Sequence, residues 1–233
     1  MTENEAKLRI GAIVFPRMDQ MDVTGPFEVL SRIPGATFNL CWKEVTPVHD
    51  MNGFSITPDM RFDEAPDFDL LVVPGGLGQE ALMDDEIILG FIRKHTMRGR
   101  LVFSVCTGAL LCGAAGILRG VKSTTHWASF HLLPYFGAIP VNARVVIDGK
   151  HISSAGVTSG IDGALRVAAL LSSDEVAQQI QLGIEYAPEP SLAGGTPDSA
   201  SAEVLEVVRK TYGPISDARL VTAKRCAARL GIK

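Results

Sequence analysis

The chain has 233 residues, of which 46% are hydrophobic and 21% are charged, close to the averages for a globular protein. Its 22 Lys and Arg against 26 Asp and Glu give a net charge of −4, so no basic field predicts a nucleic-acid or anionic-membrane partner. No apolar run approaches the roughly 20 residues that span a bilayer, and the polar, acidic start lacks the features of a secretory signal. Four scattered cysteines indicate reduced thiols in a cytoplasmic protein, and neither a zinc site nor a disulfide framework.

Short apolar runs alternate with helical segments along most of the chain. Buried strands are predicted at residues 10–15, 37–42, 69–74 and 101–105. Helices are predicted from Pro26, which suits a first helical position after a Gly25 or Thr24 cap, and over 85–97, 106–118 and 160–171. A hairpin is expected between 145–147 and 151–153, around Asp148-Gly149. This alternation predicts an α/β fold, a mostly parallel sheet with helices on both faces.

The C-terminal region differs in composition from the rest. Residues 188–201 are rich in Pro, Gly, Ser and Ala, and helical patterns follow over 202–212 and 215–230. We expect one α/β domain over residues 1–190 and a helical appendage of the same domain over 191–233. The basic side chains of this region are interpreted as a solvated helix face rather than a binding patch: Arg209, Lys210, Arg219, Lys224, Arg225 and Arg229.

Cys106 lies where a predicted buried strand turns into a helix, and it is followed by Thr107 and Gly108. In such a turn the side chain projects from the carboxyl end of the sheet, where ligands bind open α/β sheets. The helix N-terminus favours an anion, which predicts a lowered thiol pKa, and its N–H groups can hold developing negative charge. A small thiol that only packs is the alternative, and the local sequence weighs the two interpretations evenly.

Asp22 is expected in the loop that leaves the first strand, just before the predicted helix. That loop reaches the same carboxyl edge of the sheet as Cys106. A carboxylate there can act as a general acid or base if its surroundings tune its pKa. A solvated aspartate or an Asx turn is the alternative, and it is the commoner role of an isolated loop aspartate.

Gly76, Gly78 and Ala81 form a G-x-G-x-x-A pattern after the strand at 69–74, which raises the possibility of a dinucleotide site. That strand is internal to the chain, however, and no clear second strand ends in an acid about 20 residues on. We therefore favour a tight turn whose backbone N–H at Gly76 faces an anionic intermediate.

His126 follows Cys106 in the sequence Thr124-Thr-His-Trp127. A cysteine and a histidine frequently form a nucleophile and its base, but linear spacing does not establish contact. A purely structural histidine is the alternative, and for a lone motif it is the commoner outcome.

Together these segments resemble the ThiJ/PfpI superfamily of flavodoxin-like proteins with a cysteine at a nucleophile elbow. The matching segments are Asp22–Leu30, Val73–Gly76, Ser104–Ala109, Thr124–Trp127, Gly160–Asp162 and Glu185–Pro188. The Asp-x-Thr-Gly-Pro loop, the Cys-Thr-Gly elbow and the late Glu-Tyr-Ala-Pro segment are most similar to the branch that hydrates isocyanides. Peptidase-like and glyoxalase-like relatives carry a glutamate in the first loop or a histidine after the cysteine, so protease activity is not expected here.

The resemblance implies hydration of a small isocyanide to an N-substituted formamide, without metal or organic cofactor, in a protein that is commonly a homodimer. It implies that Cys106 adds to the isocyanide carbon, and that Asp22 donates a proton and later activates water. Thr107 would hydrogen-bond the intermediate, while Gly76 and His126 would bind negative charge or substrate.

Other function classes stay open at this stage. The chain is alternatively a glyoxalase-like enzyme, a metabolite-binding regulator, or a redox sensor in which Cys106 is oxidised by peroxide. A further branch of the family regulates transcription through a pair of helix-turn-helix motifs. The roughly 45 residues after Pro188 are too few for such a pair, so we expect no nucleic-acid partner.

Overall fold

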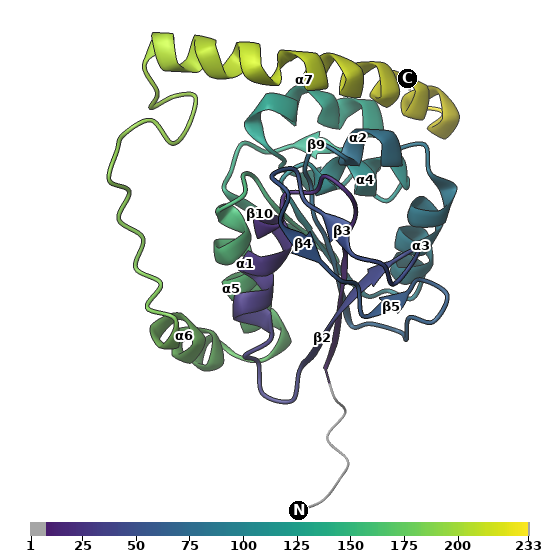
Figure 1. The fold of residues 1–233 in the computed structure, drawn as a ribbon, viewed down its shortest axis with the longest axis vertical. Coiled ribbons are helices and arrows are strands. Elements are labelled where there is room, and N and C mark those ends of the chain that lie inside the picture. The colour runs from purple at the N-terminus through teal and green to yellow at the C-terminus, as the bar shows by residue number, and fades with distance from the viewer. Residues whose placement is uncertain (1–7, 233) are drawn as a thin grey trace, which may run out of the picture.

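A seven-stranded sheet forms the centre of the structure, a computed structural model that describes residues 8–232 (Figure 1). Its strands follow the order β10-β11-β7-β6-β1-β2-β5, and all neighbours are parallel except the antiparallel pair of β10 and β11. These strands are β1 (Arg9–Ile13), β2 (Thr37–Trp42), β5 (Met60–Arg61), β6 (Leu70–Val73), β7 (Leu101–Val105), β10 (Val145–Asp148) and β11 (His151–Ser154). The five inner strands have the flavodoxin-like order, which confirms the predicted fold class.

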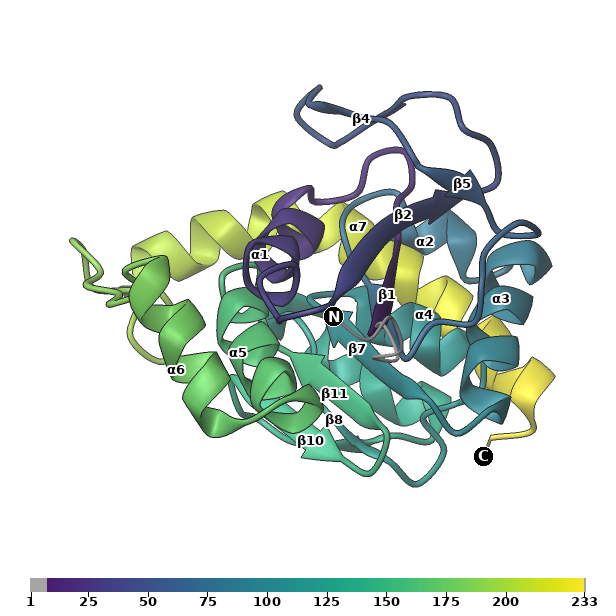
Figure 2. The same ribbon diagram turned by 90° about the horizontal axis from the view of Figure 1, so that it is seen from below.

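Helices cover both faces of this sheet, as the alternation of elements predicts (Figure 2). They are α1 (Met21–Leu30), α2 (Gln79–Leu82), α3 (Glu86–Met97), α4 (Gly108–Ala114), α5 (Ser159–Leu171), α6 (Asp174–Gly183) and α7 (Ala202–Leu230), with the 3₁₀ helix η1 (Trp127–Phe136). Two short ladders complete the fold, β3 (Val48–His49) with β4 (Ser55–Ile56) and β8 (Lys122–Ser123) with β9 (Ile139–Pro140). Helices α1 and α5 pack together on one face, while α3 and α4 pack together on the other. No helix within residues 8–232 is long and apolar enough to cross a bilayer.

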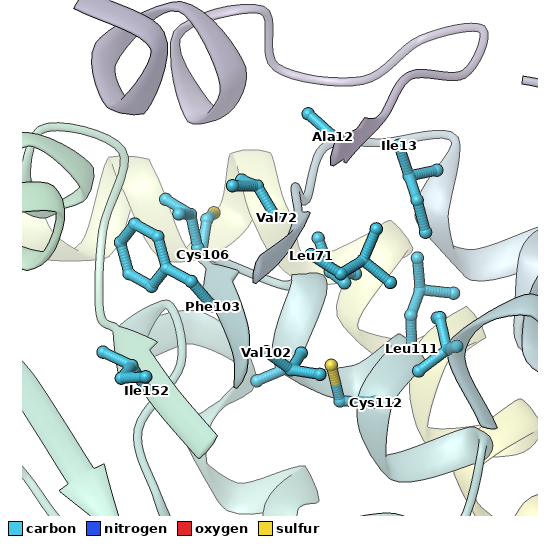
Figure 3. Packing of buried hydrophobic residues seen from close by; sticks show 14 of the residues in the cluster. Ala12, Ile13, Leu71, Val72, Val102, Phe103, Cys106, Leu111, Cys112 and Ile152 are labelled. Atoms are coloured by element: carbon cyan, nitrogen blue, oxygen red, sulfur yellow. The ribbon is translucent and has the colours of Figure 1, made fainter. Parts of the chain in front are cut away.

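The core lies on both sides of β1, β6 and β7, which are neighbours in the sheet. All four residues of β6 are fully buried, because a central parallel strand meets helices on both faces. Figure 3 shows aliphatic side chains of the three strands packed together, with Cys106 just beyond Phe103. Since the three strands are parallel, the loops that leave them meet at one edge of the sheet, which we call the strand edge.

The start of α1 differs from the prediction, which placed Pro26 at the first helical position. The helix begins at Met21, whose N–H donates to the Asp19 carboxylate (3.1 Å). Pro26 lies inside the helix, where its missing N–H deprives only the carbonyl of Asp22 of a helical partner. Asp22 is therefore in the first turn of α1, and the prediction that it lies in a loop is wrong.

Two further helices differ from their predicted limits. The helix after the Cys106 turn is short and ends at Ala114, ahead of Gly116, which has a positive φ of 82°. Residues 202–230 form one continuous helix, α7, with Pro214 inside it.

An extended, mostly exposed segment over residues 184–201 carries the chain from α6 to α7 along the outside of the molecule (Figure 1). Helix α7 then packs against η1 and α2, next to the strand edge.

Candidate active site

Cys106 occupies the turn between β7 and α4 with a φ of 55°, in the left-handed region that non-glycine residues rarely adopt. Its N–H donates to the Ser154 carbonyl of β11 (3.1 Å), and its carbonyl accepts a hydrogen bond from the Thr125 hydroxyl (2.7 Å). Such a conformation persists only where the surrounding structure holds it, as these two bonds do. The predicted strand–turn–helix position of Cys106 is confirmed.

A cavity of about 40 Å³ lies at the strand edge beside the Cys106 thiol, which is only 6% exposed. Residues of the strand edge and of α7 line it, with others from the β3–β4 turn, the loop after β11 and the residue before η1: Asp19, Met51, Gly76, Leu77, Cys106, Thr107, His126, Val157, Tyr212 and Arg219. Four of the five site residues predicted from the sequence thus meet at one cavity. The fifth, Asp22, is buried behind Cys106.

The Asp22 carboxylate is fully buried and has one backbone partner. Its Oδ2 accepts a hydrogen bond from the Gly75 N–H (2.8 Å), whereas Oδ1 has no hydrogen-bond partner within residues 8–232. Burial raises the pKa of this carboxyl well above its usual value, Asp19 raises it further, and the Gly75 N–H and the Cys106 thiol oppose the rise. Burial therefore favours the protonated form of Asp22, the form that a general acid requires.

The Cys106 thiol and the Asp22 carboxyl share one buried site. Burial and the neighbouring Asp22 raise the pKa of Cys106 well above its ordinary value, while the Thr107 backbone N–H and Arg219 lower it. The lowered pKa expected from the helix N-terminus alone is therefore wrong, because the sequence does not reveal how deeply the thiol is buried beside an acid. The two groups titrate as a coupled pair, on which one negative charge is much less costly than two.

Glycines let the loop after β6 approach the start of α4 very closely. A Cβ on Gly75 would lie 2.5 Å from the backbone nitrogen of Thr107. A Cβ on Gly108 would lie 2.0 Å from the carbonyl oxygen of Val73. Neither backbone can retreat without moving a central strand, so both positions require glycine.

The backbone N–H groups of the glycine-rich turn already have partners inside the protein. Gly75 donates to Asp22, and Gly76, with a φ of 124°, donates to the Thr107 hydroxyl (3.2 Å). Gly78 donates to a backbone carbonyl of the loop after β1 (3.0 Å). These bonds do not favour the dinucleotide alternative, which requires free N–H groups for a pyrophosphate. The Gly76 N–H faces the Thr107 hydroxyl, which itself lines the cavity.

His126 lines the cavity, and its ring packs against those of Trp127 and Tyr212, at centroid distances of 5.5 and 5.4 Å. Its Nδ1 accepts a hydrogen bond from the Ala128 N–H (3.3 Å). Burial and the positive charge of Arg219 lower the pKa of His126 to about 4, so the ring is neutral at pH 7. With Nδ1 engaged, the ring offers Nε2–H as a donor rather than a base for Cys106.

Arg219 of α7 is a site residue that the sequence analysis missed. Its side chain is 3% exposed, so the interpretation as part of a solvated helix face is wrong for this residue. Nη2 donates to the Gly76 carbonyl (2.7 Å) and lies 3.4 Å from the Thr107 hydroxyl oxygen, while Nε donates to Gln79 (3.1 Å). A long side chain from the end of the chain thus joins two parts of the strand edge.

One sequence signal could have found Arg219. It stands four and seven residues before Ala223 and Cys226, so the three share one face of α7, and all are buried. An arginine in the apolar stripe of an otherwise polar helix indicates a buried polar contact.

Comparisons with known proteins show the family to which this chain belongs. The profile of the DJ-1/PfpI family matches residues 8–170. The chain is 44% identical over 226 residues to an isonitrile hydratase of Pseudomonas putida, across 97% of this chain and 99% of that protein. It is 35% identical over 105 residues to a deglycase of Pyrococcus horikoshii, a match that covers only 44% of this chain and 63% of the deglycase.

Solved structures give the same result for the fold. A ThiJ/PfpI family protein from Pseudomonas syringae superposes with a TM-score of 0.91 and 35% identity, covering 94% of this chain and 91% of that one. DJ-1beta of Drosophila melanogaster, at 23% identity and a TM-score of 0.69, covers 77% of this chain and 98% of its own length. The ThiJ/PfpI resemblance is therefore confirmed, and the chain belongs to the DJ-1/PfpI family.

Proposed function

We propose that this protein is an isocyanide hydratase that converts R–N≡C and water into the formamide R–NH–CHO. The observation that carries the proposal is the 44% identity to an isonitrile hydratase over nearly the full length of both chains. That match covers 97% of this chain, which extends beyond the shared DJ-1/PfpI region at residues 8–170. A buried cysteine beside a buried carboxyl of raised pKa gives the proposed reaction its chemistry.

In the first proposed step, the Cys106 sulfur bonds to the terminal carbon of the isocyanide. The same carbon takes a proton, which gives the thioimidate R–N=CH–S–Cys106. Asp22 supplies this proton, because burial raises its pKa and so favours its protonated form, and the Cys106 thiol is its neighbour. The step transfers the single negative charge of the pair from sulfur to the Asp22 carboxylate.

In the second step, the Asp22 carboxylate takes a proton from a water molecule as the water oxygen adds to the thioimidate carbon. Asp22 passes that proton to the substrate nitrogen, which leaves a tetrahedral adduct, R–NH–CH(OH)–S–Cys106. The hydroxyl proton then returns to Asp22, the C–S bond breaks, and the formamide departs. Cys106 leaves as a thiolate, and the pair regains its starting charge.

Three further residues have proposed roles around the reacting carbon. The Thr107 hydroxyl hydrogen-bonds the substrate nitrogen as negative charge develops there. Gly76 acts through Thr107, whose oxygen its N–H holds. His126 offers its Nε2–H as a neutral donor to the bound substrate.

The test compares wild type with Cys106→Ala, each incubated with cyclohexyl isocyanide, and measures the formamide by chromatography. We expect product from wild type and none from the variant. Cys112→Ala is the matched control, since Cys112 is buried in α4 and does not line the cavity. Full activity of Cys106→Ala would contradict the covalent mechanism.

A second assay with glyoxal separates this proposal from the glyoxalase-like alternative. Acid-quenched intact mass of wild type during turnover tests the covalent step, because a trapped thioimidate adds the mass of one isocyanide to the chain, and Cys106→Ala should show no added mass. Turnover of glyoxal without any isocyanide hydration would reject the proposed substrate class. If wild type turns over no isocyanide and peroxide selectively oxidises Cys106, a thiol sensor would be favoured.

We also propose that the protein is a cytoplasmic homodimer. Large apolar side chains lie exposed along α6, the segment 184–201 and the start of α7: Leu182 and Leu192 are 82% and 84% exposed, and Val204 and Val207 54% and 65%. Burying them against a second copy removes this surface from water. Sedimentation analysis tests the assembly, and Leu192→Glu with Val207→Glu is expected to give monomers. All four cysteines are free, as suits a reducing compartment.

A further inference from the structure

Arg219 is a buried cation whose hydrogen-bond partners are all neutral. Its guanidinium donates to Gln79 Oε1, Ser129 Oγ, the Gly76 carbonyl and Thr107 Oγ1. No Asp or Glu within residues 8–232 forms an ion pair with it, although other arginines of α7, such as Arg225, pair with carboxylates. Burial lowers the pKa of Arg219, while Cys106, Glu80 of α2 and Tyr212 raise it. Glu80 accepts a hydrogen bond from the Thr222 hydroxyl and forms no ion pair with Arg219, so a charge on Cys106 would stabilise the buried guanidinium.

Of the described ionisable side chains that surround Cys106, Arg219 is the one that supplies a positive charge. Asp22 and Asp19 are acids, and Tyr212 carries a phenol. His126 is neutral at pH 7 because its pKa lies near 4. Among the described residues that line the cavity, Arg219 is therefore the one that carries a positive charge near neutral pH.

We propose that Arg219 is the counter-charge of the Cys106 thiolate and the positioning residue for the Thr107 hydroxyl. The inference deepens the proposed function and rests on it for the identity of the nucleophile. In the proposed starting state the Cys106–Asp22 pair carries one negative charge, and Arg219 is the cation of the cavity that offsets it. The guanidinium also favours departure of Cys106 as a thiolate when the C–S bond breaks.

The hydrogen bonds of Thr107 support the positioning role. Its hydroxyl oxygen accepts from the Gly76 N–H (3.2 Å) and from Nη2 of Arg219 (3.4 Å). A hydroxyl has two acceptor lone pairs and one proton, so two accepted bonds leave the proton free to donate. Because Thr107 lines the cavity, that proton is available to a bound intermediate.

Arg219 also reaches the site from outside the part of the chain that the family shares. The DJ-1/PfpI match ends at residue 170, whereas α7 begins at Ala202. The reactivity of Cys106 would then depend on a helix that the shared region does not supply.

The test measures the pH dependence of Cys106 alkylation by iodoacetamide, followed by peptide mass spectrometry. We expect Arg219→Gln to raise the midpoint of the alkylation profile by about one unit or more, because an opposite charge at close range shifts a pKa by that amount. Arg219→Lys keeps the positive charge but loses the planar, multiply donating guanidinium. We expect its alkylation midpoint to lie close to that of wild type, while its hydratase kcat stays low. Arg225→Gln, an exposed position on the same helix, is the control and should leave the midpoint unchanged.

A second variant leaves Arg219 in place. In Gln79→Glu a carboxylate replaces the amide whose oxygen accepts from the Arg219 Nε (3.1 Å). The amide nitrogen of Gln79 has no hydrogen-bond partner within residues 8–232, so the change removes no bond. The new ion pair should neutralise the guanidinium and raise the alkylation midpoint as Arg219→Gln does. This variant decides the question if Arg219→Gln does not fold.

The possible results separate the two proposals. An unchanged midpoint in folded Arg219→Gln, or in Gln79→Glu, would overturn the role of Arg219. Alkylation does not require isocyanide, so a shifted midpoint without any hydratase activity would support Arg219 while rejecting the proposed function.

Discussion

The strand edge and α7 contribute to one cavity by different physical means. At the strand edge, Cys106, Gly75 and Gly76 are fixed by backbone, because three adjacent parallel strands end together and glycines let their loops touch. Helix α7 contributes long side chains, Tyr212 and Arg219, that reach in from a separately packed element. The rigid edge thus holds the groups proposed to make and break bonds, and the helix sets their electrostatic surroundings.

If the comparison is correct, removing the acid at the strand edge should have the largest effect. Asp22→Asn keeps an oxygen to accept the Gly75 N–H bond but cannot transfer a proton. We expect the hydratase kcat/KM to fall by about 10²- to 10⁴-fold, the usual contribution of a general acid or base. Glu28→Gln is the control, since Glu28 is an exposed carboxylate on the same helix. Near-normal turnover by Asp22→Asn would show that a group other than Asp22 donates the proton.

Stability should respond in opposite directions in the two regions. Gly108→Ala places a Cβ against the Val73 carbonyl, and we expect it to lower the free energy of unfolding by about 2–3 kcal/mol. Gly90→Ala on α3 is the matched control, because its Cβ meets only the tip of one arginine at 3.9 Å. Pro214→Ala on α7 restores a helical N–H and should cost nothing or stabilise by up to about 1 kcal/mol. Urea unfolding monitored by circular dichroism measures all three.

The smallest effect concerns two histidines, His151 in β11 and His126 next to α7. Burial lowers both pKa values to about 4, below the unfolded value of 6.5. A base with a depressed folded pKa stabilises the protein above the unfolded pKa, and this contribution is lost as the pH falls toward 4. Between about pH 7 and about pH 4.5, wild type should lose about 2 kcal/mol more than His151→Gln. The difference for His126→Gln should be smaller because that ring is only half-buried. Equal losses in wild type and both variants would contradict these assignments.

The sheet was predictable from the sequence because its strands are continuous apolar runs. The predicted strands at 37–42 and 101–105 coincide with β2 and β7. The start of α1 was not predictable, since the general preference of proline for a first helical turn pointed to Pro26. The helix instead begins where the Asp19 side chain satisfies a backbone N–H, a contact that depends on the path of the loop.

The site was predictable to the extent that it follows strand ends. Cys106, Thr107 and Gly76 come directly after buried strands, so their place at one edge followed from the topology alone. Arg219 lies beyond the extended segment 184–201, which has no periodicity to show where it leads. The burial that raises the pKa of Cys106 is likewise a product of elements packed from elsewhere in the chain.

The bond between Arg219 and Gly76 spans 143 residues of chain. A contact so distant in sequence needs a long loop to close, and we expect it to form late in folding. The sheet and its elbow can therefore be native before the guanidinium arrives. We expect amide hydrogen exchange to show α7 opening at a lower free energy than β6 and β7. Each time α7 detaches, the sheet would stay folded while the cavity lacks the positive charge of Arg219.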